Sequence, residues 1–526
     1  MNREIPCRIK QSAAVGVLIA FCFMVILRLV FTVNGENDVD PFYHVRIAME
    51  GWSVYTAQTF PTMTLSTWSE CFADKELLFH ILLSGVQNAV LALGLPDFPF
   101  HMPNLFFLFL ILLAFACAGI RYRVRGLWVL IPFLFCLCGV FTFRAMMLRP
   151  HLLSIALMLL SCAVYPSIRT LRDAWIAVLL GIVFVWGYSN PHFLLFSAGA
   201  FSVAYFLKDR KRGILLLGST LVGLLFGFLL HPQNPNTFIN WKIQCIDVPL
   251  MLFTGKQESF LADELMYSGF HIMKTSFLFC LPLIILFLGN IGLSISLFFR
   301  RRRVFFQPEI LAVMMLGFMT MIGFCGALRF IEYAMPFNLL LFGVLFSRVV
   351  RIPKEKRRVG ALLSVLALSL CAFGVWMHHY EGMEYFTRRP ATHLAKWFAS
   401  FGDSVPRGLV LGNLNWSDFP QLYYAMPQMR YLCGLDPTFG YVYKTEITTK
   451  LQAFCKQKID LSPEELANLI GTPIFYLSFR DSSLAKKMYV SGYRMIYLGA
   501  DGRLFTSLGH GNLALPQRKN SPENHK

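Results

Sequence analysis

Residues 34–52 read Asn34-Gly-Glu-Asn-Asp-Val-Asp-Pro-Phe-Tyr-His-Val-Arg-Ile-Ala-Met-Glu-Gly-Trp52 and directly follow an apolar run over residues 12–33. Pro41 suits the first turn of a helix because its φ angle is already fixed near the helical value. A helix is therefore predicted to begin here, with Tyr43, Ile47 and Trp52 forming an apolar stripe at a membrane interface. Four ionisable side chains fall within nine residues at this predicted membrane exit: Asp38, Asp40, His44 and Arg46.

An acidic pair beside an interfacial helix suits two kinds of chemistry. Asp38 and Asp40 could hold a divalent cation such as Mg²⁺ or Mn²⁺, or serve as acid or base on a substrate at the bilayer surface. The competing interpretation is a solvated polar loop, in which Asp40 only caps the helix.

The composition is that of a polytopic membrane protein. Hydrophobic residues make up 56% of the 526 residues and charged residues 15%, against about 25% charged in soluble domains. The first apolar run is too long for a signal peptide and has no small-residue cleavage site, so it is predicted to be an uncleaved anchor. Eleven spans of roughly the required ~20 residues are predicted near 12–33, 104–120, 127–143, 152–168, 174–189, 193–207, 213–230, 275–299, 305–326, 330–347 and 359–378. Residues 77–95 are also apolar and are predicted to be re-entrant or to lie on the outer interface, although a crossing remains an alternative.

Lysine and arginine predict the orientation. With the N-terminus in the cytoplasm, the inward loops hold 22 Lys and Arg, against eight in the outward loops before residue 379. The positive-inside rule therefore predicts a cytoplasmic (inner) membrane protein with its N-terminus inside. The net charge of +18 lies mostly in these inward loops, where membrane lipids are the ordinary partner, so it does not indicate nucleic-acid binding.

This orientation gathers the unusual polar residues at the outer ends of the spans. Six groups lie there: Asp38 to Arg46, Asp74-Lys-Glu76, Arg149-Pro-His151, Asn190-Pro-His192, His231-Pro-Gln-Asn234 and Arg329-Phe-Ile-Glu332. Ionisable groups at membrane depth are costly and usually mark a pathway or a site. One such histidine is more often structural, but six groups on one face favour a functional site.

The chain changes character after residue 378. Short apolar bursts alternate with helical stretches over 379–510, which predicts a small α/β domain. Ser462-Pro-Glu-Glu465 predicts the start of one of its helices, and residues 511–526 are predicted to be disordered. The odd number of spans predicts that this domain is outside the cytoplasm. Cys433 and Cys455 could form a disulfide in an oxidising compartment.

The run from Asp38 to Glu76 resembles the first extracytoplasmic loop of the GT-C glycosyltransferases. It matches the Asp-Pro-(aromatic)-Tyr-His-x-Arg pattern of archaeal-type oligosaccharyltransferase catalytic subunits. Motifs shared with bacterial GT-C proteins follow in order: Phe60 to Ser66, Trp68 with Lys75-Glu-Leu-Leu-Phe79, Arg149-Pro-His151, Trp186 to His192, and Arg329 to Pro336. Asn415-Trp-Ser-Asp-Phe-Pro420 and Gly434 to Phe439 look like the tail of the same set. The Trp-Trp-Asp-Tyr-Gly motif of oligosaccharyltransferases is absent, which puts protein N-glycosylation in doubt.

The resemblance implies a mainly α-helical membrane bundle that moves a sugar from a polyprenyl-phosphate donor to an extracytoplasmic glycan, lipid or protein. The departing phosphate needs cations or a metal, and the acceptor needs a base. Asp40 is predicted to be that base or a metal ligand, with Asp38 as its partner and Glu76 as a second candidate. The predicted substrate-binding residues are His44, Arg46, Arg149, His151, Asn190, His192, Arg329 and Glu332.

Two other functional classes remain open from the sequence. A lipid-sugar flippase would also line a membrane cavity with polar groups, but it should carry them at mid-membrane and in broken helices of both halves. A non-catalytic partner protein with a degenerate GT-C core is the second alternative. Arg329 and Glu332 could also form a purely structural ion pair.

Overall fold

The structure is a computed structural model. It describes residues 38–95, 99–254, 277–350, 366–375, 391–402 and 405–507, and residues 24, 27, 360, 363 and 364 singly. The predicted anchor at 12–33 and the predicted disordered tail at 511–526 therefore lie essentially outside the described residues. The chain forms two compact units. The helical unit comprises Met1–Asp38, Asp74–Trp241 and Leu261–Thr387, and the mixed unit comprises Val39–Ala73, Lys242–Phe260 and Arg388–Lys526.

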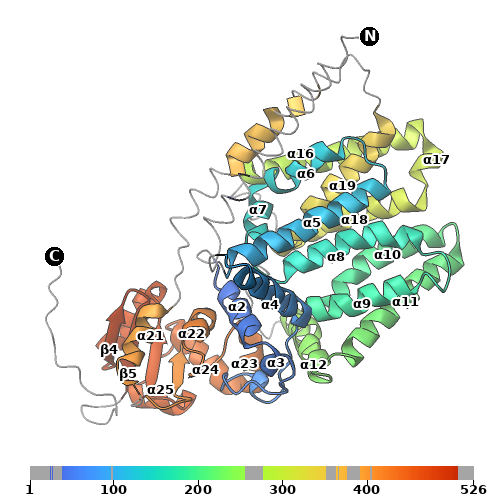
Figure 1. The fold of residues 1–526 in the computed structure, drawn as a ribbon. Coiled ribbons are helices and arrows are strands. Elements are labelled where there is room, and N and C mark those ends of the chain that lie inside the picture. The colour runs from blue at the N-terminus through green and yellow to red at the C-terminus, as the bar shows by residue number, and fades with distance from the viewer. Residues whose placement is uncertain are drawn as a thin grey trace. The chain divides into compact units, whose positions relative to one another are not determined.

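The helical unit is a bundle of apolar helices (Figure 1). Its α-helices are α4 (Leu77–Ala92), α5 (His101–Arg121), α6 (Leu127–Cys136), α7 (Gly139–Ala145), α8 (His151–Val164), α9 (Trp175–Gly187), α10 (Leu194–Phe206), α11 (Arg210–Leu229), α12 (Asn236–Lys242), α16 (Phe277–Arg300), α17 (Arg302–Phe305), α18 (Pro308–Gly326) and α19 (Ile331–Val349). Short 3₁₀ turns connect some of them: η2 (Tyr165–Ser167), η3 (Pro191–Phe193) and η5 (Leu328–Phe330).

Five helices of the described residues are long and apolar enough to cross a membrane by themselves. They are His101–Arg121, Arg210–Leu229, Cys280–Arg300, Pro308–Gly326 and Leu328–Val349. The predicted span at 127–143 is instead two helices, α6 and α7, bent by 82°. The bend falls at Cys138, whose backbone is extended. Several other predicted spans are shorter apolar helices, and residues 77–95 form the 16-residue helix α4.

Small residues let helices α9 and α11 approach closely. A Cβ atom added at Gly181 would lie 2.7 Å from the backbone of Gly223, and one at Gly223 would lie 2.4 Å from the carbonyl oxygen of Val178. Neither position can carry a side chain without separating the helices. In a bilayer, where lipid tails are as apolar as the helices, such close packing is a main source of helix association.

Polar side chains inside the bundle are paired with one another. Asn290 on α16 donates to the carbonyl oxygen of Asn338 on α19 (2.9 Å), and Asn338 donates to the carbonyl oxygen of Gly317 on α18 (3.0 Å). Both asparagines are fully buried. These bonds join α16, α18 and α19 where an unpaired amide would be costly.

The mixed unit contains a five-stranded sheet in the order β2-β1-β3-β5-β4. Strands β1 (Val410–Asn413), β2 (Arg430–Tyr431) and β3 (Ile474–Leu477) are parallel, and β4 (Arg494–Gly499) and β5 (Gly502–Thr506) add an antiparallel hairpin. The helices of this unit are α2 (Asp40–Glu50), α3 (Trp52–Tyr55), α13 (Val248–Phe253), α21 (Thr392–Ala399), α22 (Phe419–Ala425), α23 (Pro437–Tyr443), α24 (Thr445–Cys455), α25 (Pro463–Ile470) and α26 (Ser482–Val490), together with η1 (Thr67–Ser69), the π-helical turn η4 (Ile243–Asp247), η8 (Trp416–Asp418) and η9 (Phe479–Asp481). The prediction of a mainly helical protein with a small C-terminal α/β domain is confirmed.

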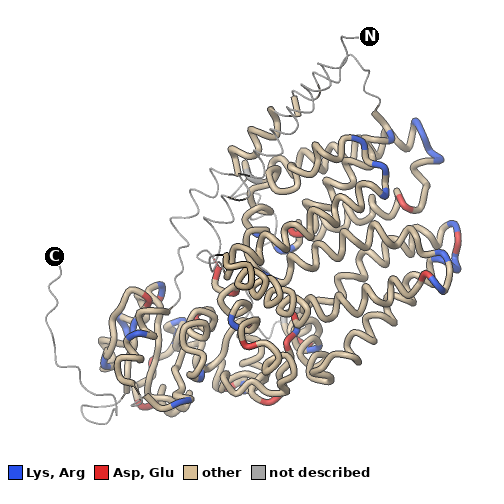
Figure 2. Tube along the Cα trace, in the orientation of Figure 1, with Lys and Arg blue, Asp and Glu red and all other residues tan. Residues whose placement is uncertain are grey.

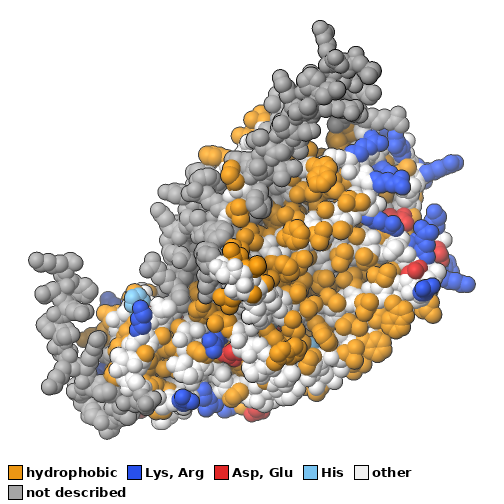
Figure 3. Space-filling view, in the orientation of Figure 1, with side chains coloured by type: hydrophobic (Ala, Val, Ile, Leu, Met, Phe, Trp, Pro, Cys, Tyr) orange, Lys and Arg blue, Asp and Glu red, His pale blue; other side chains and the backbone are white. Residues whose placement is uncertain are grey.

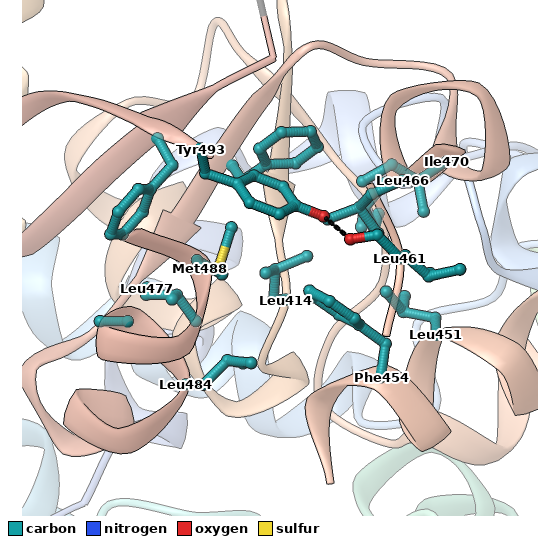
Figure 4. Packing of buried hydrophobic residues seen from close by; sticks show 14 of the residues in the cluster. Leu414, Leu451, Phe454, Leu461, Leu466, Ile470, Leu477, Leu484, Met488 and Tyr493 are labelled. Carbon is teal, nitrogen blue, oxygen red and sulfur yellow. Dashed lines mark hydrogen bonds between the residues drawn. The ribbon is translucent and has the colours of Figure 1, made fainter. Parts of the chain in front are cut away.

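Helix α25 begins where the sequence predicted. The Ser462 hydroxyl accepts from the backbone of Glu465, and the Glu465 carboxylate accepts from the backbone of Ser462, so the two form a capping box. One side of the sheet is packed by an apolar cluster that includes Leu414, Leu466 and Tyr493 (Figure 4). The Tyr493 hydroxyl donates to the carbonyl oxygen of Leu461 (2.9 Å), which satisfies the one polar atom that this ring buries.

The predicted outer loop folds as part of the mixed unit. Leu65 donates to the carbonyl oxygen of Leu432, and Tyr431 donates to that of Thr62, both at 2.7 Å. The ring of Phe42 packs edge-on against Tyr424 at 5.4 Å. Residues Val39–Ala73 are therefore tied by backbone and ring contacts to residues far along the chain.

This packing corrects the predicted interfacial stripe. Tyr43 and Ile47 are buried inside the mixed unit, with Tyr43 facing Phe419 and Tyr423, whereas Trp52 is 68% exposed. The stripe was inferred from apolar spacing, which shows that a helix face is covered but not by what. Cys433 and Cys455 are free thiols in the structure.

Candidate active site

Asp38 and Arg149 form a two-pronged ion pair at the start of helix α8. The Nε and Nη2 atoms of Arg149 each donate to a different oxygen of Asp38, at 2.5 Å. Helix α8 begins at His151 and Pro150 is its N-cap residue, so Arg149 lies just outside the helix. A planar guanidinium matches a carboxylate in this geometry, and a lysine could not reproduce it. Asp38 was predicted to partner Asp40, and the structure gives it Arg149 as a partner 111 residues away.

Glu332 is bound by an arginine that the sequence analysis did not select. The Nε of Arg144 on α7 donates to Oε1 of Glu332 on α19 at 2.7 Å, and Nη2 of Arg144 donates to the same oxygen. Both side chains are buried. Arg144 is thus one ion-pair partner of Glu332, and the alternative of a structural pair between Arg329 and Glu332 stays a prediction. The signal was present in the sequence, since Arg144 follows an apolar run and a charge at such depth is rare.

His151 lies in the middle of these charges. Its Nε2 is 3.0 Å from the carbonyl oxygen of Arg144, so this nitrogen carries the proton and donates. Glu332, Arg149 and Arg329 are all close enough to His151 to act on it electrostatically. Residues of two of the predicted groups, Arg149-Pro-His151 and Arg329-Phe-Ile-Glu332, therefore lie close together inside the helical unit.

Two tyrosines extend this cluster toward Asn190. Tyr188 is buried within electrostatic range of Arg329 and Glu332 and is adjacent to Asn190 and Tyr333. The hydroxyls of Tyr333 and Ser154 are 2.7 Å apart, which ties α19 to α8. Neither tyrosine was selected from the sequence, because a tyrosine in an apolar run is ordinary.

The loops that carry Asn190 and Arg329 pack on each other through aromatic rings. Phe193 stacks on Phe330 with a centroid separation of 5.5 Å. The side chain of His192 makes its hydrogen bond outside this cluster. Its Nδ1 accepts from the indole nitrogen of Trp241 at 3.4 Å.

Asp74 belongs to a buried network that positions Glu76. Both oxygens of Asp74 are 2.8 Å from Nδ1 of His80, and one accepts from the backbone N–H of Glu76 at 3.1 Å. The backbone N–H of Asp74 donates to the side chain of Gln233 at 2.7 Å. Glu76, the second-line catalytic candidate, is itself largely buried. These contacts hold the residues just before α4 against α4 and against Gln233.

His231 is linked to this network through Gln233, and its own side chain is neutral. Its Nδ1 accepts from the backbone of Gln233 (3.2 Å) and lies 2.8 Å from the hydroxyl of Thr237. Burial lowers the pKa of His231 to about 4, although the nearby Asp74 carboxylate opposes the shift. This histidine is therefore uncharged at neutral pH and acts as a hydrogen-bond acceptor.

The remaining predicted residues lie in the mixed unit. Asp40 is the first residue of α2, and Val39 occupies the cap position without a side-chain bond. Asp40 is therefore the first helical residue and not the N-cap residue, and its charge favours the first turn through the helix dipole. Arg46 donates from Nε to Glu50 at 2.9 Å, one turn along the same helix, and His44 is buried.

No described group of three or more His, Cys, Asp or Glu side chains is arranged to hold a metal ion. Both oxygens of Asp38 already accept from Arg149, so a cation at this residue would first have to displace a guanidinium. The predicted Mg²⁺ or Mn²⁺ at Asp38 and Asp40 stays a prediction, and the reaction below does not depend on it.

Comparison with known proteins gives a match of fold and none of sequence. No protein-family model and no curated protein matches the chain. The archaeal oligosaccharyltransferase AglB from Archaeoglobus fulgidus, solved with an inhibitory peptide and a dolichol-phosphate, is similar in structure. Its TM-score is 0.59 at 12% identity, covering 94% of this chain and 74% of AglB.

A second match is ArnT from Cupriavidus metallidurans. Its apo structure has a TM-score of 0.58 at 14% identity and covers 96% of this chain and 99% of ArnT. Its complex with undecaprenyl phosphate has a TM-score of 0.57 at 13% identity and covers 96% and 100%. At such identities the likeness is one of fold. The prediction of a GT-C-type membrane fold, distantly similar to oligosaccharyltransferase catalytic subunits, is thereby confirmed.

Proposed function

We propose that this protein is a membrane glycosyltransferase that moves a sugar from a polyprenyl-phosphate donor to an acceptor outside the cytoplasm. The observation that carries the proposal is the gathering of Arg144, Arg149 and Arg329 around His151, with Asp38 and Glu332 as the paired carboxylates. Guanidinium groups are suited to bind an anionic phosphate, because their N–H donors match its oxygens.

The donor class is inferred from the fold matches together with these charges. AglB was solved with a dolichol-phosphate and ArnT with undecaprenyl phosphate. A donor of this kind keeps its tail in the bilayer and presents its phosphate at the membrane surface. Arg149 is the preferred phosphate ligand, because Asp38 fixes the plane and direction of its guanidinium before the donor arrives. Arg329 is the second ligand.

In the proposed reaction, an acceptor hydroxyl attacks the anomeric carbon of the sugar. The new bond forms between this carbon and the acceptor oxygen, and the bond from the carbon to the phosphate oxygen breaks. A carboxylate takes the acceptor proton, and Asp40 is the candidate base. The polyprenyl phosphate leaves with both electrons of the broken bond, and the arginines stabilise its added charge.

The arrangement of Arg144 and Glu332 supports a positioning role for that pair. Arg144 holds Glu332 on α19 and, through its carbonyl oxygen, holds the ring of His151 on α8. The pair thus joins α7, α8 and α19 around the proposed phosphate ligands. A preorganised set of donors needs no rearrangement as charge develops, which is how such sites lower a barrier.

The test is mass spectrometry of lipid-linked sugars and surface glycans in a deletion strain. The strain is complemented with the wild type, with Arg149→Ala, or with the exposed control Arg210→Ala. We expect the deletion and Arg149→Ala to accumulate a polyprenyl-phosphate sugar and to lose a sugar from one surface glycan, lipid or protein. The control should restore the product. Unchanged lipid-linked sugars and surface glycans in the deletion strain would refute the proposal.

The same experiment separates the two alternatives. Loss of a flippase would leave the lipid-linked sugar on the cytoplasmic leaflet, where an impermeant periodate reagent added to intact cells cannot oxidise it. Loss of the proposed transferase would leave it outside and accessible. A non-catalytic partner would be complemented equally well by the wild type and by Arg149→Ala.

A further inference from the structure

An apolar cavity lies in the helical unit near the ends of α16 and α18 that α17 connects. Its volume is about 310 Å³, at the lower end of the ~300–1,000 Å³ typical of ligand pockets. The side chains lining it come from three helices and include Ile291, Ile295, Phe298, Phe305, Met314 and Phe318. Ile295 is exposed, so the cavity opens on the surface of the bundle and is not sealed within it.

The cavity is separate from the candidate active site within the same unit. Its lining residues on α18 are Met314 and Phe318, whereas Arg329 follows the end of that helix at Gly326. Phe318 and Met314 precede Gly326 by eight and twelve residues, about 12 and 18 Å of helix at 1.5 Å per residue. The cavity is therefore not the place where the proposed donor phosphate binds.

Four consecutive arginines, Arg300–Arg303, run from the last residue of α16 into α17, next to the lining residues Phe298 and Phe305, and all four are exposed. Glu309 is the single acidic residue between residues 277 and 326, and it lies 3.5 Å from the hydroxyl of Tyr205. Figure 2 shows Lys and Arg gathered at this end of the helical bundle, and Figure 3 shows the apolar surface next to them.

One of these arginines is held against a ring that lines the cavity. The guanidinium carbon of Arg302 lies 5.5 Å from the ring centroid of Phe298 and 5.9 Å from that of Phe306. Both distances are within the roughly 6 Å range of a cation–π contact. Phe298 thus lines the apolar cavity and also contacts the positively charged Arg302.

We propose that this is a binding site for an anionic phospholipid of the bilayer. An acyl chain fills the cavity between α16 and α18, and the headgroup phosphate binds Arg301, Arg302 and Arg303. The positive-inside rule assigns this end to the cytoplasmic leaflet, whose anionic lipids attract clustered basic residues. The site is separate from the proposed sugar transfer and does not depend on it.

The test measures lipid retention by the purified full-length protein with native mass spectrometry. The probes are dioleoyl phosphatidylglycerol and dioleoyl phosphatidylcholine, which carry the same tails and differ in headgroup charge. We expect the anionic lipid to bind preferentially to one site. The triple variant Arg301→Gln, Arg302→Gln, Arg303→Gln should weaken its binding about tenfold or more, since each basic residue near a bilayer contributes about fivefold.

Two further variants separate charge in general from this site. Lys208→Gln, Arg210→Gln, Lys211→Gln removes three exposed charges at and just before the start of α11 in the same unit and should leave binding at the single site unchanged. Ile295→Trp fills the cavity while keeping the arginines and should weaken binding. These residues are exposed, and thermal unfolding of each variant checks that it remains folded.

Four outcomes would overturn the proposal. Equal retention of the two lipids would indicate ordinary bilayer contact. Full retention of the anionic lipid by the triple arginine variant would show that these arginines do not contribute to binding. Full retention by Ile295→Trp would show that the cavity does not contribute. Displacement of the lipid by glycerol phosphate alone would indicate an anion site without a role for the acyl chain.

Discussion

The buried pair Arg144–Glu332 gives the sharpest quantitative prediction about the helical unit. The Glu332 side chain is fully buried, and the side chain of Arg144 is 5% exposed. Glu332→Gln keeps the shape of the side chain but leaves a guanidinium in a dry interior without its countercharge. Removing one partner of a buried ion pair costs about 3–5 kcal/mol of folding free energy. Arg144→Met should cost a similar amount, because it removes an ion-pair partner from a buried carboxylate.

The double variant Arg144→Met, Glu332→Leu distinguishes two contributions to the free energy of unfolding. One is the net stabilisation by the ion pair, and the other is the cost of leaving one buried charge without the other. Replacing both charges with apolar residues of similar volume is often close to neutral, so we expect the double variant to be more stable than either single one. The coupling free energy should therefore be several kcal/mol, far above the ~0.5 kcal/mol within which independent sites add.

The assay is reversible unfolding of the purified protein in mixed micelles, followed by circular dichroism as denaturing detergent increases. Glu332→Gln should shift the midpoint strongly, and Ser296→Ala on α16 serves as a mild substitution in the same unit. Additive single effects, or a Glu332→Gln cost below about 1 kcal/mol, would contradict a buried ionic pair.

Four further predictions concern the site, the mixed unit and the topology. Asp40→Ala should abolish sugar transfer in membranes while expression stays normal, and wild-type product levels would contradict a catalytic first loop. Arg329→Lys should lower the transfer rate about a hundredfold, since a lysine cannot bind phosphate bidentately, whereas Arg210→Lys should not. Burial and the nearby Asp481 raise the pKa of Asp418 to about 8, so its contribution to stability is complete below pH ~4 and is lost as the pH rises toward about 8. Asp418→Asn should flatten this pH dependence of unfolding, and an unchanged slope would show that Asp418 is not the group responsible. A phosphatase reporter fused after residue 526 should be active, because the C-terminal residues are predicted to be outside the cytoplasm.

Local properties of the chain were predictable from the sequence, because each depends only on neighbouring residues. Hydropathy identified α5, α11, α16, α18 and α19 as apolar helices, since an apolar run of that length has few other stable forms in a membrane protein. Ser462 with Glu465 marked the start of α25, and Pro41 marked that of α2, because capping and φ restriction act within one turn.

Some departures at the site also have local causes. The break between α6 and α7 falls inside a continuous apolar run, and hydropathy carries no signal for a bend. Arg144 was overlooked because the predicted span ended at residue 143, immediately before it, so that its burial was not expected.

The tertiary structure alone decided which residues meet. Asp38 pairs with Arg149 across 111 residues, and Arg144 with Glu332 across 188. Such a pairing depends on the path of the whole chain. The burial of Tyr43 and Ile47 was decided in the same way, because an apolar helix face specifies that it must be covered and leaves open whether lipid or protein covers it. The sequence therefore determined the membrane class, the helices and the kinds of residues at the site, whereas long-range packing determined their partners.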